Sequence, residues 1–219
     1  FDDEGDVGVL RTWRAMCPAL QERWPEDEQP EDWEGVEMEN GRVVELWLDE
    51  FDLTGAVPAE IGRLSALRQL SLGENQLTSV PAEIGQLTSL RVLFLGGNQL
   101  TSLPAEIWQL TALEELNLGY NQLTSVPAVI GQLTSLTVLY LYNNKLTSVP
   151  AEIGQLTSLE DLNLADNQLR SVPAEIGQLT SLRELGLSDN RLTTLPAAIR
   201  ELRSAGCRVR TDGGVTVDE

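Results

Sequence analysis

The chain has 219 residues, of which 42% are hydrophobic, enough for a continuous core, and its formal net charge at pH 7 is −19. This charge argues against a nucleic-acid partner, because a phosphate backbone needs a basic surface, and against attachment to an anionic membrane. No apolar run approaches the roughly 18 residues that span a bilayer.

The leading segment is acidic, with 16 acidic and 4 basic side chains in residues 1–50. We interpret it as solvated, and the alternative is that it helps to attract a basic partner. Within it, apolar residues recur at helical spacing from Val9 to Trp24. This spacing predicts one or two short helices, with Pro18 either starting the second or bending the first.

A hairpin is predicted next, because Asn40-Gly41 is a turn signal between residues 35–39 and 42–49. The open hydrophobic end of a stacked core has to be covered. We therefore expect residues 1–42 to form an N-terminal cap of short helices and a hairpin strand. Trp24 and Trp33 are its expected buried anchors.

Residues 43–205 read as seven repeats. The stretch LTSVPAEIGQLTSL, first found at residues 77–90, returns every 23 residues with few changes, and the first repeat has 24 residues. Such a period indicates a solenoid, in which each repeat packs on its neighbours. The L-x-L pattern places two leucines on one face of a short strand, and PAEIGQLTSL supplies the return that parallel strands need. We predict an α/β solenoid, a curved horseshoe with a parallel β-sheet on its concave face, short helices or 3-10 turns on its convex face, and caps at both ends.

One asparagine in each later repeat stands where the chain leaves the strand, and the first repeat carries Phe51 there. An amide side chain has both donors and an acceptor for backbone groups that a turn leaves unpaired. We predict an interior ladder of Asn75, Asn98, Asn121, Asn144, Asn167 and Asn190. Trp108 stands where other repeats have glycine, and we interpret it as core filler in preference to a second contact.

The end of the chain reads as a second cap. AAIRELRSAG is a more helical variant of the return segment, with Gly206 as its stop. Asp212-Gly213-Gly214 then lies between two short alternating runs. We predict a hairpin over residues 206–219 that closes the far end.

These motifs resemble those of leucine-rich repeat proteins over residues 33–205. The repeats are similar to the intracellular 23-residue kind with LPxxI at mid-repeat. The leading segment is similar to the N-terminal cap of plant-type members at residues 33–38, 41–43 and 53–58. Met38 stands where that cap has a disulfide cysteine. The resemblance implies the fold and says almost nothing of function.

Exposed strand positions vary between repeats, whereas the return segments hardly change. All three tyrosines fall on or beside the strands, and acidic residues outnumber arginines there. Tyrosine and tryptophan are preferred anchors of protein interfaces. We predict a partner site on the concave face, formed by Trp47, Phe94, Glu115, Tyr120, Tyr140, Tyr142 and Asp161.

Several glycines border this predicted site, among them Gly73, Gly97 and Gly119, and we expect them to let a partner approach closely. The partner surface should be neutral to basic. The alternative interpretation is that the aromatic residues only pack on one another.

Catalysis is not indicated. The chain has no histidine, no phosphate-binding loop and no metal-spaced cysteine cluster. We expect no cofactor and no metal site. Cys17 and Cys207 lie near opposite ends, about 30 Å apart if repeats stack at roughly 4.8 Å, too far for a disulfide. Unpaired thiols, no N-x-S/T sequon and no signal-peptide pattern lead us to expect a cytoplasmic protein.

The leading functional hypothesis is a monomeric, non-catalytic protein–protein interaction module that binds a protein through its concave face. One alternative is a sensing or scaffold segment of a larger signalling protein associated with a kinase or GTPase domain. Another is an engineered consensus repeat without a natural partner, which the near-identical return segments favour and the irregular caps oppose.

Overall fold

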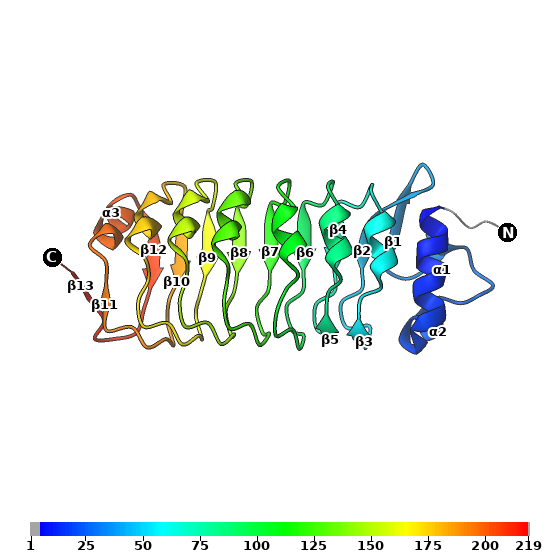
Figure 1. Ribbon diagram of the computed structural model, residues 1–219, viewed down its shortest axis with the longest axis horizontal. Helices are drawn as coiled ribbons and strands as arrows, with labels where there is room; N and C mark the ends of the chain where they lie inside the picture. The colour runs from blue at the N-terminus through cyan, green and yellow to red at the C-terminus, as the bar shows by residue number, and fades with distance from the viewer. Residues whose placement is uncertain (1–4, 219) are drawn as a thin grey trace. The chain divides into compact units, whose positions relative to one another are not determined.

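A computed structural model describes residues 5–218 of the chain (Figure 1). The first four residues of the predicted N-terminal cap and Glu219 of the predicted C-terminal hairpin lie outside the described residues. The chain forms two compact units, residues 1–113 (unit 1) and residues 114–219 (unit 2).

Unit 1 begins with two α-helices, α1 (Asp6–Met16) and α2 (Pro18–Arg23), followed by the 3-10 helix η1 (Pro30–Asp32). Pro18 starts α2, because a proline in the first turn leaves no N–H group unpaired. Strands β1 (Val36–Glu39) and β2 (Arg42–Trp47) pair antiparallel. The turn residues Asn40 and Gly41 have φ of 51° and 75°, which confirms the predicted hairpin.

Three tryptophans form the core of this cap. Trp24 is fully buried, its ring stacks on that of Trp33 at a centroid distance of 5.0 Å, and it meets Trp13 edge-on at 6.4 Å. The indole N–H groups of Trp24 and Trp33 donate to the backbone oxygens of Glu34 (2.8 Å) and Pro25 (2.9 Å). The large rings are therefore buried with their polar atoms satisfied.

Asp6 shows that the leading segment is not simply solvated, as its acidic composition suggested. Its side chain is 6% exposed and accepts hydrogen bonds from Arg42 Nε (3.0 Å) and the backbone N–H of Val43 (2.9 Å). A buried carboxylate is tolerable only when it is paired in this way. Asp6 thus ties the start of α1 to the start of β2.

The repeats of unit 1 extend the sheet from β2, with β4 and β6 added parallel and in register. Each return segment after a proline forms a 3-10 helix. A second, two-stranded parallel sheet, which the repeat pattern did not predict, pairs β3 with β5. These elements are β3 (Thr54–Ala56), η2 (Ala59–Arg63), β4 (Gln69–Ser71), β5 (Gln76–Ser79), η3 (Ala82–Gln86), β6 (Val92–Phe94) and η4 (Ala105–Gln109).

Unit 2 repeats the same strand and 3-10 helix alternation and ends in the α-helix α3. Its strands β7, β8, β9 and β10 are parallel neighbours. The elements are β7 (Glu115–Asn117), η5 (Ala128–Gln132), β8 (Val138–Tyr140), η6 (Ala151–Gln155), β9 (Asp161–Asn163), η7 (Ala174–Gln178), β10 (Glu184–Gly186), β11 (Thr194–Leu195), α3 (Ala198–Ser204), β12 (Arg208–Arg210) and β13 (Thr216–Val217).

The predicted C-terminal hairpin over residues 206–219 is wrong. β12 pairs parallel with β10, and β13 pairs parallel with β11, so the two last strands do not pair with each other. Asp212 follows β12 and accepts the backbone N–H of Asp189 at 2.9 Å, so the segment fits the end of the preceding repeat. β12 is held by the edge of the main sheet at β10, which offers more backbone partners than a short isolated hairpin. The predicted helix stop is found at Gly206, with φ of 96°.

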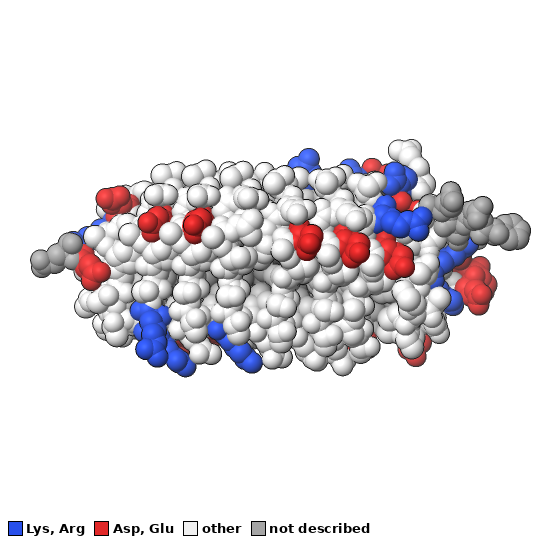
Figure 2. Space-filling model, in the orientation of Figure 1, with Lys and Arg blue, Asp and Glu red and all other residues white. Residues whose placement is uncertain are grey.

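The core of each unit lies between its sheet and its 3-10 helices. Leu116 and Leu139 of the strands and Ile130 and Leu133 of the return segment are fully buried. Trp108 is 3% exposed, so it fills the core as predicted. Figure 2 shows carboxylates along the 3-10 helices of each unit, and it also shows patches of lysine and arginine. No helix within residues 5–218 has the length and apolar character to cross a membrane.

Candidate functional site

The candidate site is the exposed side of the sheet in unit 2, which we call the strand face. Strand register sets which side chains are neighbours there. Glu115, Val138 and Asp161 occupy one position on three successive strands, and Asn117, Tyr140 and Asn163 occupy the next exposed position. The leucines between them are buried in the core. Alternation along a strand therefore places two neighbouring rows of variable side chains on the strand face.

Tyr120, Tyr140 and Tyr142 form one contiguous group, which we call the tyrosine cluster. The rings of Tyr120 and Tyr142 meet edge-to-face, with centroids 5.3 Å apart and planes at 87°. Tyr140 and Tyr142 are 6.0 Å apart with planes at 65°. These geometries are favourable for aromatic pairs. The cluster presents ring faces in different directions, and Tyr120 is 53% exposed.

Gly119 is the reason that Tyr142 can lie where it does. A Cβ atom at position 119 would lie 2.6 Å from Cζ of Tyr142. Gly73 gives space in the same way to Asp49, and Gly97 to Glu74. The expectation that these glycines leave room for a partner is therefore wrong, because side chains of neighbouring repeats already fill the space.

Tyr140 is joined to Asp161 on the next strand. Its hydroxyl donates a hydrogen bond to Asp161 Oδ2 at 2.9 Å. Partial burial, this hydrogen bond and the nearby charges of Asp161 and Glu115 together raise the pKa of Tyr140 to about 12. The phenol therefore remains a neutral donor at neutral pH, and it fixes the orientation of both side chains.

The other two predicted aromatic residues, Trp47 and Phe94, belong to unit 1. Trp47, Ser71 and Phe94 share one position on β2, β4 and β6. Trp47 is 45% exposed, and its indole N–H donates to Glu45 Oε2 at 3.0 Å. Ser71, between them, is nearly inaccessible at 1%. The structure thus places the seven predicted contact residues in two groups, with the tyrosine cluster, Glu115 and Asp161 in unit 2.

The asparagines after the strands are hydrogen-bonded inside the stack. In unit 2, the amide of Asn144 donates to the backbone oxygens of Leu118 (2.9 Å), Leu141 (3.1 Å) and Tyr142 (3.2 Å), and its Oδ1 accepts the N–H of Leu123 (2.9 Å). Asn75, Asn98, Asn121, Asn144 and Asn167 are buried, and Asn190 is partly exposed. These residues hold the turns that follow the strands, including the turn that carries Tyr142.

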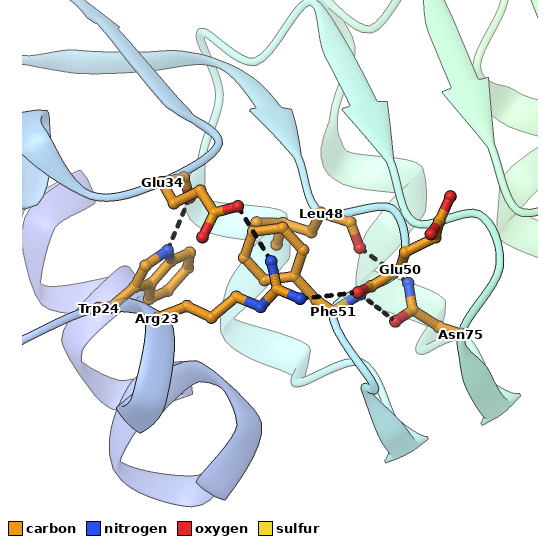
Figure 3. Close-up of polar contacts among 7 residues, drawn as sticks. All are labelled: Arg23, Trp24, Glu34, Leu48, Glu50, Phe51 and Asn75. Carbon is orange, nitrogen blue, oxygen red and sulfur yellow. Dashed lines mark hydrogen bonds and ion pairs between the residues drawn. The ribbon is translucent and has the colours of Figure 1, made fainter.

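Phe51 replaces the asparagine in the first repeat, where the cap supplies different neighbours (Figure 3). The backbone N–H of Phe51 donates to Asn75 Oδ1 at 3.1 Å, and the guanidinium of Arg23 lies 4.4 Å from the centre of its ring. Arg23 also bonds Glu34 Oε1 (2.9 Å) and the backbone oxygen of Glu50 (3.1 Å). An apolar ring therefore stands between the asparagine ladder and the cap. Its cation–π contact with Arg23 occurs once in the chain, so no periodicity in the sequence predicts it.

The chemistry of the site suits binding. Among residues 5–218, no three acidic, cysteine or histidine side chains come together as a metal site. Cys17 and Cys207 are both free thiols, and burial raises the pKa of the Cys207 thiol. What the strand face offers is a set of ring faces, two carboxylates and the fixed backbone beneath them.

The sequence and the structure are similar to those of known proteins of one family. A model of the leucine-rich repeat region matches residues 41–165, and a model of two leucine-rich repeats matches residues 157–201. A solved leucine-rich repeat protein of Leptospira interrogans is 40% identical over 75% of this chain and 47% of its own, with a TM-score of 0.58. No curated protein matches the chain.

Two receptor kinase ectodomains of Arabidopsis thaliana are also similar. GASSHO1/SCHENGEN3, solved with CASPARIAN STRIP INTEGRITY FACTOR 2, is 26% identical with a TM-score of 0.74, over 97% of this chain and 30% of its own. HAESA, solved with an N-terminally extended IDA peptide hormone, is 27% identical with a TM-score of 0.71, over 97% of this chain and 41% of its own. The chain thus spans less than half the length of each of these three proteins.

Proposed function

Because the chain belongs to the leucine-rich repeat family, we propose that it is a non-catalytic binding module that takes a segment of a protein partner on the strand face of unit 2. The repeat region of this family is typically used for protein–protein interaction and is typically non-catalytic. The fold supplies a rigid sheet, and the variable side chains on it supply the recognition.

The observation that carries this proposal is the exposure of the tyrosine cluster. Within residues 5–218, the large hydrophobic residues that are exposed are Met16, Trp47 and Tyr120. Tyr120 is the one that is in contact with further aromatic rings. Exposed and rigidly packed tyrosines are typical anchors of interfaces, because they bury a large area and lose little conformational freedom.

The comparisons support a peptide-like partner. Both receptor ectodomains described above were solved with a peptide or protein factor bound. A sheet that presents one row of side chains after another suits an extended segment, which can place successive side chains on successive strands. We therefore propose an extended segment as the occupant of the strand face.

A second candidate function uses the same strand face, but within a longer protein. The chain spans 47% or less of each similar protein described above. It could accordingly serve as the sensing or scaffold segment of a larger signalling protein. The sequence of the flanking gene distinguishes the two candidates, since only the second requires a continuous reading frame into a catalytic or membrane-anchoring domain.

The test compares partner capture by three forms of the chain. Wild type, Tyr140→Ala/Tyr142→Ala and the control Thr134→Ala/Thr157→Ala are immobilised and exposed to the same lysate, and the retained proteins are identified by mass spectrometry. The control threonines are exposed and lie beside the 3-10 helices. We expect the tyrosine variant alone to lose the specific partners. Retention of the same partners by all three forms contradicts the proposal.

A further inference from the structure

Two carboxylates beside the tyrosine cluster form no ion pair within the described part of the chain. Glu115 and Asp161 occupy the same position on β7 and β9, on either side of Val138. Asp161 Oδ2 accepts the hydroxyl of Tyr140, and among residues 5–218 no ion pair joins either carboxylate to a lysine or arginine. Both act on Tyr140 through their charge. Neither of these two charges is thus balanced by an ion pair beside the cluster.

Neighbouring acidic residues of unit 2 are compensated. Arg183 lies 3.4 Å from Glu160, and Glu184 is paired with both Arg208 (2.9 Å) and Arg210 (3.4 Å). The contrast is specific, because Glu184 belongs to the same strand position as Glu115 and Asp161. Among the described residues, the lack of an ion pair at Glu115 and Asp161 is therefore a local property of this part of the strand face.

This arrangement limits what can cover the cluster. An apolar segment laid over Tyr140 would remove water from Asp161 and Glu115 without replacing the lost interactions, and burying an unpaired carboxylate is costly. A basic side chain avoids that cost. Its charge is attracted both by the carboxylates and by the faces of the tyrosine rings.

Resting on the proposed function, we propose that the tyrosine cluster, Asp161 and Glu115 receive an arginine side chain of the bound segment. Arginine fits better than lysine because its planar guanidinium stacks on a ring while its N–H groups reach a carboxylate. The ring planes of Tyr120 and Tyr140 are both inclined to that of Tyr142, so the cluster has more than one face against which a flat cation can lie. This arginine is thus the residue by which the strand face selects its partner segment.

The test uses a random 12-residue peptide library displayed on phage. The library is selected on the wild-type chain after depletion on the Tyr140→Ala/Tyr142→Ala variant, so that retained peptides require the cluster. We expect these peptides to share an arginine at a fixed position. Replacing it by citrulline, which keeps the shape and removes the charge, should weaken binding at least fivefold.

Two charge variants complete the experiment. Asp161→Asn should weaken the selected peptide at least fivefold, whereas Asp166→Asn, which removes one negative charge from an exposed turn of unit 2, should change its affinity less than twofold. Circular dichroism spectra and melting curves that match wild type show that each variant is folded.

Other outcomes overturn one proposal or both. Peptides that need the tyrosines but share no arginine, or that bind equally well with citrulline, contradict the arginine site and leave the strand-face proposal standing. Recovery of lysine at the fixed position, with no arginine, overturns the choice of arginine. A library that yields no peptide dependent on Tyr140 and Tyr142 contradicts both proposals.

Discussion

The hydroxyl of Tyr140 donates a hydrogen bond to Asp161 Oδ2 across neighbouring strands at 2.9 Å. The two residues lie 21 positions apart in a chain whose repeat is 23 residues long. The bond therefore runs diagonally, from one exposed row of the sheet to the next. It links the aromatic and the acidic parts of the strand face and orients both.

The titration of Tyr140 follows from this contact. Its pKa is raised from the ordinary 10.0 to about 12. Since the folded chain keeps this proton while the unfolded chain loses it, folding stability should fall as pH rises from about 10 to about 12. The difference in absorbance at 295 nm between wild type and Tyr140→Phe gives the titration curve of this residue. A midpoint near 10 contradicts the assignment.

The buried asparagines should contribute strongly to stability. Asn144→Leu removes four hydrogen bonds and leaves the buried N–H group of Leu123 without a partner, so we expect the free energy of unfolding to fall by about 1–3 kcal/mol. Urea denaturation measures it. Asn190→Leu is the matched comparison, because Asn190 makes the same set of bonds but is partly exposed, and water can replace them. An equal loss in both variants contradicts this explanation.

The first repeat should be destabilised by asparagine at position 51, although all later repeats carry asparagine at the equivalent position. Phe51 packs under Arg23, and the cap provides an apolar environment there. We expect Phe51→Asn to lower the free energy of unfolding by about 3 kcal/mol or more, and Phe51→Leu by about 1 kcal/mol. Thermal denaturation of the two variants checks the order. If Phe51→Asn is the more stable of the two, the asparagine ladder can extend to position 51, and the interpretation that the cap requires an apolar residue there is wrong.

Close packing of the 3-10 helices gives a further prediction. A Cβ atom at Gly154 would overlap the backbone oxygen of Glu175 in the next repeat, and a backbone atom cannot move aside as a side chain can. Gly154→Ala should therefore destabilise the chain by about 1–3 kcal/mol. Gly213→Ala is the control, since no atom lies within 4 Å of its added Cβ, and it should be close to neutral. Calorimetric melting of both proteins decides.

Much of the fold is predictable from the repeat itself. The spacing of leucines and asparagines predicts the strands, the return segments and the buried amides, because every repeat meets nearly the same neighbours. The ends are less predictable. Asp6 is buried by Arg42, and β12 joins the sheet edge, through contacts that occur once in the chain and leave no periodic signal.

The candidate site, too, is predictable only in part. The sequence places Tyr140 and Asp161 on neighbouring strands, but it does not give the side-chain rotamers that bring the hydroxyl to the carboxylate. It also does not reveal that the ring of Tyr142 fills the space beside Gly119. Nor does it show which carboxylates are paired, since Glu184 and Asp161 stand at the same strand position and only Glu184 has arginine partners.

The most direct test of the central claim is site-specific photo-cross-linking on the strand face. p-Benzoylphenylalanine is placed at Tyr120 in one protein and at Thr134, an exposed position beside the 3-10 helices, in another. After irradiation in the same lysate, we expect a specific covalent adduct of the protein substituted at Tyr120 and none of that substituted at Thr134. An adduct formed only from position 134 would contradict a partner site on the strand face.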